Sequence, residues 1–328
     1  MTLGFKTRIT ELLDIQHPIL CGGMMHLSDA TYVAAVVNAG AMGFISALTF
    51  PDPEQLRDEI QKCRGLTGNK SFGVNLYISP RNDANNRLDS LLSVVLEEQV
   101  FVVETAGGNP GSIVPIMKEA GIKVIHKVPA VRFALSAERA GVDAIILVGA
   151  ECGGHPGNMM VGSMVQGADG PLNLSVPVVL GGGIGHGSQL TAALAMGCEG
   201  ILMGTRMLVS EEIWAHRDYK QRVVEGTGQD SLVVQTTIKN HHRVLHNKTS
   251  EAVMELERQG AKDYDSFAHL LKGSLAKEAY TSGDTSQGLL DYGQSACFAN
   301  EIEPAEKIIS RFIKEAIVSA DRLPTVLR

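Results

Sequence analysis

The chain has 328 residues, of which 44% are hydrophobic and 20% are charged, and its formal net charge at pH 7 is −7. This composition is typical of a globular protein with a large core, and the negative charge argues against a nucleic-acid partner, because such proteins need clustered Lys and Arg. The five cysteines are scattered and form no CxxC pair, so the sequence predicts no disulfide framework and no structural metal site.

The N-terminal stretch, residues 1–20, carries charged residues between its apolar ones. It therefore lacks the continuous apolar segment of a signal peptide. Nowhere in the chain do about 18 apolar residues follow one another, which is the length that a membrane-spanning helix needs. We therefore expect no membrane span and a cytoplasmic location.

Short apolar runs recur at regular intervals between residues 17 and 205. Most of their residues are Val, Ile, Leu and Phe, which is typical of strands that are buried on both faces, as in parallel sheets. The eight runs are HPILCGG (17–23), MGFIS (42–46), FGVNLY (72–77), VFVVETA (100–106), KVIHKV (123–128), DAIILVG (143–149), VPVVLGGG (176–183) and GILMGT (200–205).

Amphipathic segments follow most of these runs and end at a glycine or a short polar turn. In the first of them, residues 28–41, Ser28 is the expected N-cap and Gly40 the expected stop. Eight strands that alternate with helices predict the α/β class, with the architecture of a (β/α)8 TIM barrel. An open doubly wound sheet is the main alternative, but GGGIGHG at 181–187 does not fit its G-x-G-x-x-G fingerprint.

The regular spacing of apolar runs ends near residue 206. We assign residues 1–206 to the barrel core, 207–300 to a helical cap or insertion, and 301–328 to a C-terminal helix that packs on the barrel and could serve a homo-oligomer interface. Within the insertion, His242 and His246 would face one metal ion if their segment were helical. No third ligand stands nearby in the sequence, so a solvated or partner-facing polar segment is the favoured interpretation.

Two glycine clusters follow the predicted seventh and eighth strands. GGGIGHGSQL at 181–190 is a glycine-rich turn that opens a helix, and MGTR at 203–206 places a threonine hydroxyl beside free amides. The loops after these two strands commonly build a phosphate site in barrels of this class. We therefore predict a phosphate site here; the alternative is that the glycines serve only tight turns.

Three residues at other predicted strand ends are candidates for binding a cofactor. Lys127 ends a strand within an apolar run, so its ammonium group needs a partner, which is a flavin, a phosphate or a buried acid such as Glu104. Asn75 would hydrogen-bond a flavin ring or tie neighbouring loops together. Met24 would pack on the face of a ring or fill the core.

The stretch GAECGGHPG at 149–157 places one histidine, His155, after two glycines and before a proline. Glycines let the backbone approach a ligand and imidazole titrates near neutral pH, so this loop predicts a catalytic histidine. The alternative is a histidine that satisfies backbone groups. Cys152 suggests a Cys–His nucleophile, although a small buried thiol is the commoner case. Glu151 is either an acid near the cofactor or a carboxylate bonded to backbone amides.

These pieces together resemble the nitronate monooxygenase family, formerly called 2-nitropropane dioxygenases. The matching stretches HPILCGGM, GVNL, VIHKV, GAECGGHPG, GGGI and MGTR stand in the family's order within residues 17–206, and G-x-E-x-G-G-H is the most specific of them. The resemblance implies a TIM barrel that binds FMN, with His155 as the active-site histidine. It implies a phosphate site at Gly182, Gly183, Gly204 and Thr205, a ring site at Gly22, Gly23, Met24, Asn75 and Lys127, and further cofactor contacts at Ala150, Gly153 and Gly181.

The resemblance also implies a reaction on a small-molecule substrate, namely oxidation of alkyl nitronates, and of the parent nitroalkanes, with O2. In this reaction His155 would take the α-proton of a nitroalkane or, when protonated, bind the nitronate. Two features depart from the usual family pattern: Cys152 stands where members usually have a small residue, and the HPG that follows is more like a sister branch that resembles NAD(P)H:quinone reductases. A quinone substrate with NAD(P)H as the reductant, or reduction of an enoyl thioester, is therefore the alternative.

Overall fold

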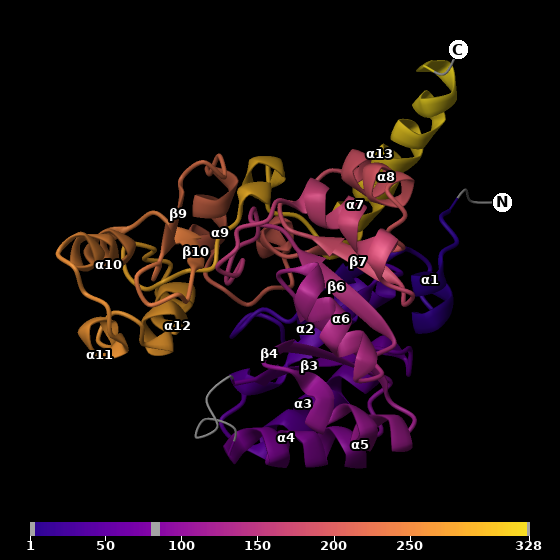
Figure 1. Cartoon of the computed structure of the whole chain (residues 1–328), viewed down its shortest axis with the longest axis horizontal. Helices are drawn as coiled ribbons and strands as arrows, with labels where there is room; N and C mark the ends of the chain where they lie inside the picture. The colour runs from indigo at the N-terminus through magenta and orange to yellow at the C-terminus, as the bar shows by residue number, and fades with distance from the viewer. Residues whose placement is uncertain (1–3, 80–85, 327–328) are drawn as a thin grey trace.

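The computed structural model describes residues 4–79 and 86–326 and shows a closed barrel of eight parallel strands (Figure 1). β1 pairs with both β2 and β8, with Ile19 opposite Ile201, so the sheet closes on itself. The predicted (β/α)8 barrel is confirmed, and each predicted run overlaps one strand. The strands are β1 (Ile19–Cys21), β2 (Met42–Ser46), β3 (Gly73–Ile78), β4 (Val102–Gly107), β5 (Lys123–Val128), β6 (Ala144–Val148), β7 (Val178–Gly181) and β8 (Gly200–Met203).

Helices surround the barrel, and each lies between consecutive strands of the chain. They are α2 (Ala30–Asn38), α3 (Pro53–Thr67), α4 (Asn86–Glu97), α5 (Val114–Glu119), α6 (Val131–Arg139), α7 (Ser163–Asn173) and α8 (Gly187–Ala195). The predicted cap of α2 is wrong by one residue, because the side chain of Asp29, not Ser28, accepts from the Tyr32 amide. Ser28 Oγ instead accepts from the Met24 amide at 2.9 Å, and so holds the loop that follows β1.

A short helix, α1 (Arg8–Leu13), closes the N-terminal end of the barrel. Its residues Ile9 and Leu13 are fully buried in a cluster with strand residues such as Leu20 and Phe44. Thr7 Oγ1 donates to the carbonyl of Glu199, directly before β8, at 2.7 Å. Because one end of the barrel is closed in this way, a ligand site is expected at the C-terminal ends of the strands.

The segment between β8 and the last helix forms a lobe beside the barrel, drawn in orange in Figure 1. The predicted helical insertion is present, but it also contains an antiparallel pair of strands with His242 opposite Val234. The segment of His242 and His246 is therefore a strand, and the helical i, i+4 spacing considered for a metal is wrong. The lobe comprises α9 (Arg217–Val224), β9 (Ser231–Val234), β10 (His242–Leu245), α10 (Lys248–Arg258), α11 (Tyr264–Phe267) and α12 (Gly273–Ser282).

The chain returns to the barrel in α13 (Ala305–Val326), which packs along α8 (Figure 1). Phe312 and Ala316 are buried in this contact, and Thr191 Oγ1 of α8 donates to the Ala316 carbonyl at 2.8 Å. A β-carbon at Gly187 would lie 2.1 Å from the Phe312 carbonyl oxygen, so only a glycine lets the two helices approach this closely.

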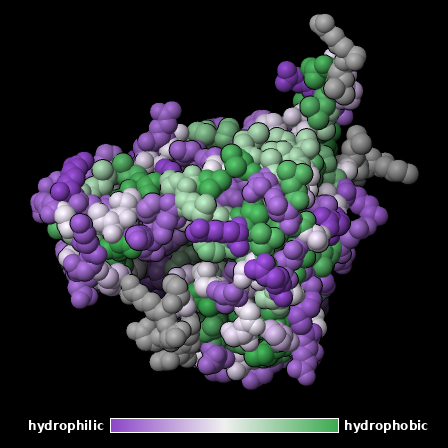
Figure 2. Space-filling view, viewed as in Figure 1, coloured by the Kyte–Doolittle hydropathy of each residue, from purple (hydrophilic) through white to green (hydrophobic). Residues whose placement is uncertain are grey.

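Hydrophobic residues gather on the outer surface over α7, as Figure 2 shows, where Met164, Val165 and Leu172 are exposed. The outer face of the insertion is mostly hydrophilic in the same view. Within residues 4–79 and 86–326, none of the helices has the length and apolar character needed to cross a lipid bilayer. The homo-oligomer that the C-terminal helix could serve stays a prediction.

Candidate active site

With the exception of Asn75, which lies in the middle of β3, the predicted cofactor and catalytic residues lie at or just after the C-terminal ends of barrel strands. This arrangement follows from the parallel sheet, because every strand ends at the same rim. Asn75 and Lys127 lie in β3 and β5. Gly22, Gly23 and Met24 follow β1; Ala150, Gly153 and His155 follow β6; Gly181 ends β7 and Gly182 and Gly183 follow it; Gly204 and Thr205 follow β8.

A fully buried carboxylate, Glu104 of β4, organises the side of the rim formed by β1, β3 and β5. Lys127 Nζ lies 2.5 Å from Glu104 Oε1, and the lysine side chain is 22% exposed. The other carboxylate oxygen accepts from the Gly23 amide at 3.1 Å and from Asn75 Nδ2 at 3.3 Å. The structure thus shows the Lys–Glu pair that the sequence left as an alternative. Through Glu104, the predicted ring contacts Gly23, Asn75 and Lys127 are held in fixed positions relative to one another.

The glycines after β7 and β8 differ in what their backbones require. Gly182 and Gly183 have φ of 99° and 70°, a region that favours glycine. A β-carbon at Gly182 would lie 2.7 Å from the Gly149 amide nitrogen, so this glycine is required by the turn itself. A β-carbon at Gly204 would meet no atom of the described residues within 4 Å. The turn therefore leaves open space beside Gly204, as a phosphate cradle would.

Gly204 is the N-cap residue of the 3-10 helix η4 (Thr205–Val209). The first amides of a helix have no acceptor within the helix, so those of Thr205 and Arg206 are available to an anion. Thr205 Oγ1 accepts from the Gly293 amide at 2.9 Å, which leaves its own hydroxyl hydrogen free to donate. These groups fit the terminal phosphate of a flavin mononucleotide.

Glu151 and Cys152 have structural surroundings. Both oxygens of Glu151 lie within 3.1 Å of the Ser163 amide at the start of α7, and Ser163 Oγ donates to Oε2 at 2.7 Å. Glu151 is thus the carboxylate bonded to a backbone amide that the sequence left as one of two alternatives. Loss of solvation raises the pKa of the Cys152 thiol to about 12. A protonated thiol is a poor nucleophile, which argues against the Cys–His pair.

His155 lies at the rim against a residue from the insertion. The backbone of Gly154 pairs with Arg243 of β10 through two hydrogen bonds of 3.0 and 2.7 Å. As a result the rings of His155 and His242 stack, with centroids 4.3 Å apart and planes 14° from parallel. His155 is exposed as a residue, yet the protein around its ring removes enough solvation to lower the pKa of the imidazole to about 4. His155 is therefore neutral at pH 7.

His242 and its partner Asp291 were not predicted as site residues. His242 Nε2 lies 2.5 Å from Asp291 Oδ1. The segment after Asp291 also reaches the rim, because the Gln294 amide donates to the Glu151 carbonyl at 3.0 Å. The sequence offered one signal, the histidine-rich stretch 240–247, but nothing in the local pattern indicated that it lies against His155.

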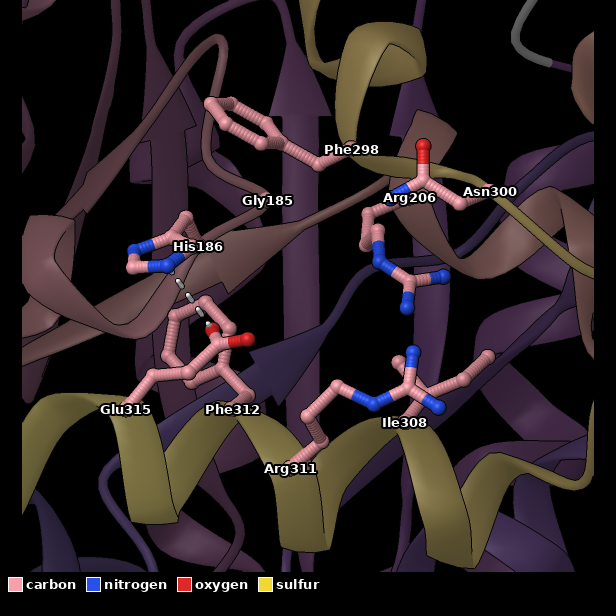
Figure 3. A pocket seen from close by; sticks show the side chains of 9 residues that line it. All are labelled: Gly185, His186, Arg206, Phe298, Asn300, Ile308, Arg311, Phe312 and Glu315. Carbon is pink, nitrogen blue, oxygen red and sulfur yellow. Dashed lines mark ion pairs between the residues drawn. The ribbon is translucent and has the colours of Figure 1, made fainter.

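A cavity lies between the loops after β7 and β8 and the helix α13 (Figure 3). Its volume is about 60 Å³, and the guanidinium groups of Arg206 and Arg311 face each other across it. Both arginines pair with Glu303, at 3.1 and 2.6 Å. His186 faces Glu315 at 3.6 Å, the contact dashed in Figure 3. Because the protein already balances these charges, we place the active site at the rim and not here.

No group of three or more His, Cys, Asp or Glu side chains in the described ranges is arranged to hold a metal ion. His246, the second histidine of the considered pair, instead lies 2.8 Å from Glu251 on the surface of the insertion. The favoured interpretation of a solvated polar segment thus fits His246. It does not fit His242, which is buried.

His126 of β5 gives a prediction about acid stability. The ring is buried, and Nδ1 lies 2.8 Å from Thr105 Oγ1. Loss of solvation, and secondarily the charge of Lys127, lowers the pKa of His126 to about 4. Between pH 6.5 and pH 4 the unfolded chain therefore binds a proton that the folded chain does not, and the free energy of unfolding falls as the pH falls. The titration of His126 alone lowers the free energy of unfolding by roughly 2 kcal/mol between pH 7 and pH 5.

We expect His126→Gln to remove most of this pH-dependent fall in the free energy of unfolding, because glutamine does not titrate. The measurement is urea unfolding of both proteins at pH 7 and pH 5. An equal fall in the free energy of unfolding in the two proteins would show that His126 is not neutral in the folded chain.

The chain matches known proteins over nearly its whole length. The model of the family described as "Nitronate monooxygenase" matches residues 6–315. A protein of Staphylococcus aureus strain MSSA476 named "Probable nitronate monooxygenase" is 29% identical, over 94% of this chain and 97% of that protein.

Two solved structures share the fold closely. FabK from Thermotoga maritima is 34% identical, with a TM-score of 0.91 over 98% of this chain and 100% of that one. The nitroalkane oxidase from Streptomyces ansochromogenes is 25% identical, with a TM-score of 0.82 over 96% of this chain and 99% of that one.

Proposed function

Because the chain belongs to the nitronate monooxygenase family, a family of flavin-dependent oxidoreductases, we propose that it uses FMN to oxidise alkyl nitronates and their parent nitroalkanes with O2. The observation that carries this proposal is His155. Its imidazole follows β6 at the barrel rim, belongs to an exposed residue and is neutral at pH 7. A neutral imidazole is the group that proton abstraction from carbon requires.

The residues at the rim fit FMN. We propose that the phosphate lies on Gly182, Gly183, Gly204 and Thr205, where the open space beside Gly204 meets the free amides of η4. We propose that the ring lies against Gly22, Gly23, Met24, Asn75 and Lys127, with Ala150, Gly153 and Gly181 completing the contact surface. When bound, the flavin supplies the redox chemistry, taking electrons from the substrate and passing them to O2.

The chain itself supplies the acid–base step. His155 accepts the α-proton of a nitroalkane through a ring nitrogen; the C–H bond breaks and its electron pair forms the C=N bond of the nitronate. Lys127 Nζ lies beside Glu104 Oε1, so the lysine can interact with a developing negative charge next to the ring while it keeps its contact with the buried acid. A substrate supplied already as the nitronate does not need this proton step.

The test is oxygen consumption by the flavin-loaded protein with a primary alkyl nitronate, compared with the parent nitroalkane. The purified protein is expected to be yellow, with absorbance near about 450 nm. Turnover of the nitronate supports the proposal. A protein that is colourless after incubation with FMN, or a yellow protein that consumes no oxygen with either substrate, would overturn it.

A second candidate, reduction of an enoyl thioester, is supported by one specific observation. FabK, an enoyl-ACP reductase, is more similar to this chain than the nitroalkane oxidase is, at 34% against 25% identity. The two functions differ in their need for NAD(P)H. Anaerobic mixing with NADH or NADPH bleaches the flavin rapidly if the protein is a reductase of enoyl thioesters or quinones, and leaves it oxidised if it acts only on nitronates. A quinone substrate and a cytoplasmic location stay predictions.

A further inference from the structure

A chain of hydrogen-bonded side chains in the insertion leads to Asp291. Asn240 Nδ2 donates to Gln235 Oε1 at 2.8 Å, which turns Gln235 Nε2 toward His242 Nδ1 at 3.2 Å. Because Nδ1 of His242 then accepts, the ring proton lies on Nε2, which donates to Asp291 Oδ1 at 2.5 Å. These hydrogen bonds therefore select one tautomer of His242.

These hydrogen-bonded side chains contact His155 at two points. The His242 ring lies on the face of the His155 ring, at 4.3 Å between centroids. Asn240 Nδ2 lies 3.4 Å from His155 Nε2, so this nitrogen is an acceptor when the ring is neutral. The pairing of Gly154 with Arg243 fixes the relative position of the two rings through the backbone. The insertion thus determines both the plane of the His155 ring and the nitrogen that carries its lone pair.

The negatively charged group beside the stacked rings of His155 and His242 is Asp291. It is faced by His242 from β10, by His155 and Lys127 from the barrel, and by His26 from the loop after β1. The Asp291 side chain is half exposed, and although the surrounding protein removes some solvation, the hydrogen bond from His242 and the nearby Lys127 lower the pKa of the carboxyl group, so it stays ionised. Two stacked imidazolium rings would repel strongly, whereas one imidazolium beside a carboxylate is favoured.

We propose that His242 and Asp291 are positioning residues for His155: the His242 ring holds the plane of the base, and the Asp291 carboxylate offsets the positive charge that the base gains when it takes a proton. The proton moves from the substrate carbon to His155 and goes no further, since stacked rings share no hydrogen bond. This inference rests on the proposed function, because it takes His155 to be the base.

Three substitutions separate the two contributions. Asp291→Asn removes the charge but keeps the size of the side chain, His242→Phe keeps the stacked ring but loses the hydrogen bonds, and His242→Ala loses both. His246→Ala is the matched control, because this histidine lies on the same segment, is half exposed and pairs only with Glu251 among the described residues. Flavin content and the thermal midpoint of each variant monitor folding.

The first measurement is kcat/KM against pH, with a nitroalkane and with its preformed nitronate. Asp291→Asn is expected to lower the nitroalkane value about fivefold or more and to move the acid limb of its profile to lower pH by about half a unit or more. His242→Phe should retain more activity than His242→Ala. Nitronate turnover should change less than about twofold in all variants, since it needs no base. An equal loss with both substrates, or an unmoved acid limb in Asp291→Asn, would overturn the proposal.

The second measurement needs no substrate and so separates this inference from the proposed function. Nitrogen-15 NMR of the histidine rings reports the tautomer of His242 and the titration midpoint of His155. We expect His242 Nδ1 to be unprotonated, and the His155 midpoint to fall by about half a unit or more in Asp291→Asn and not in His246→Ala. These shifts in a protein that oxidises neither substrate would support the coupling while the proposed function fails. An unchanged midpoint in Asp291→Asn would overturn the coupling even if nitronates are oxidised.

Discussion

Replacing His155 by alanine is expected to lower kcat/KM for a neutral nitroalkane by about 10² to 10⁴-fold, the range that loss of a general base produces. The physical reason is that the ring is neutral at pH 7 and accessible at the barrel rim, so it can accept a proton without first losing one. The measurement is steady-state oxygen consumption near neutral pH, above the lowered pKa of His155.

The preformed nitronate provides the internal control for this variant. Its turnover by His155→Ala should stay within about tenfold of the parent, because the C–H bond is already broken. Flavin content should be unchanged, since the proposed phosphate site lies after β7 and β8 and not on the loop of His155. Equal rates of parent and variant at saturating nitroalkane would exclude His155 as the base.

Replacing Gly182 by alanine is expected to cost both stability and the flavin. A non-glycine residue at φ 99° stores roughly 1–3 kcal/mol of strain. The new methyl group would also lie 2.7 Å from the backbone nitrogen of Gly149, and backbone cannot move aside as a flexible side chain can. We expect a total loss of about 4 kcal/mol in the free energy of unfolding and purification of the variant without FMN.

Gly204→Ala is the matched variant, because its methyl group would meet no atom of the described residues within 4 Å. The stability of the flavin-free protein should change by less than about 0.5 kcal/mol. FMN binding should weaken by about tenfold or more, because the methyl group enters the space proposed for the phosphate. FMN affinity measured by fluorescence titration gives the answer. Unchanged affinity in Gly204→Ala would place the phosphate elsewhere.

The barrel was predictable because its signals are local. A strand buried on both faces needs an uninterrupted apolar run, and β2 (MGFIS) and β6 (AIILV) are entirely buried. Helix caps are also local, yet Ser28 and Asp29 are both good caps, and the sequence could not choose between adjacent candidates. The hydrogen bond from the Met24 amide to Ser28 decides it, and that bond depends on the loop after β1.

The insertion shows where sequence reasoning ends. His242 and His246 fit a helical spacing, but β9 and β10 pair with each other and bury Val234 and Val244 against Phe267, a contact between distant segments. Glu104 is a second example. It stands out in the sequence as a charged residue within an apolar run, but the sequence did not show which groups it contacts. Its partners Lys127, Asn75 and Gly23 come from two other strands and from the loop after β1.

The sequence by itself determined the eight-stranded barrel, the rim at which its loops meet, the glycine turns after β7 and β8 and the presence of His155 at that rim, because each depends on residues close together in the chain. Only the tertiary structure decided that Lys127 pairs with Glu104, and that His242 and Asp291 reach His155. These contacts join residues 23, 49 and 87 positions apart. The pairing of β4 with β5 brings Lys127 to Glu104, and the packing of the insertion on the barrel brings His242 to His155, so no local pattern of residues could indicate either contact.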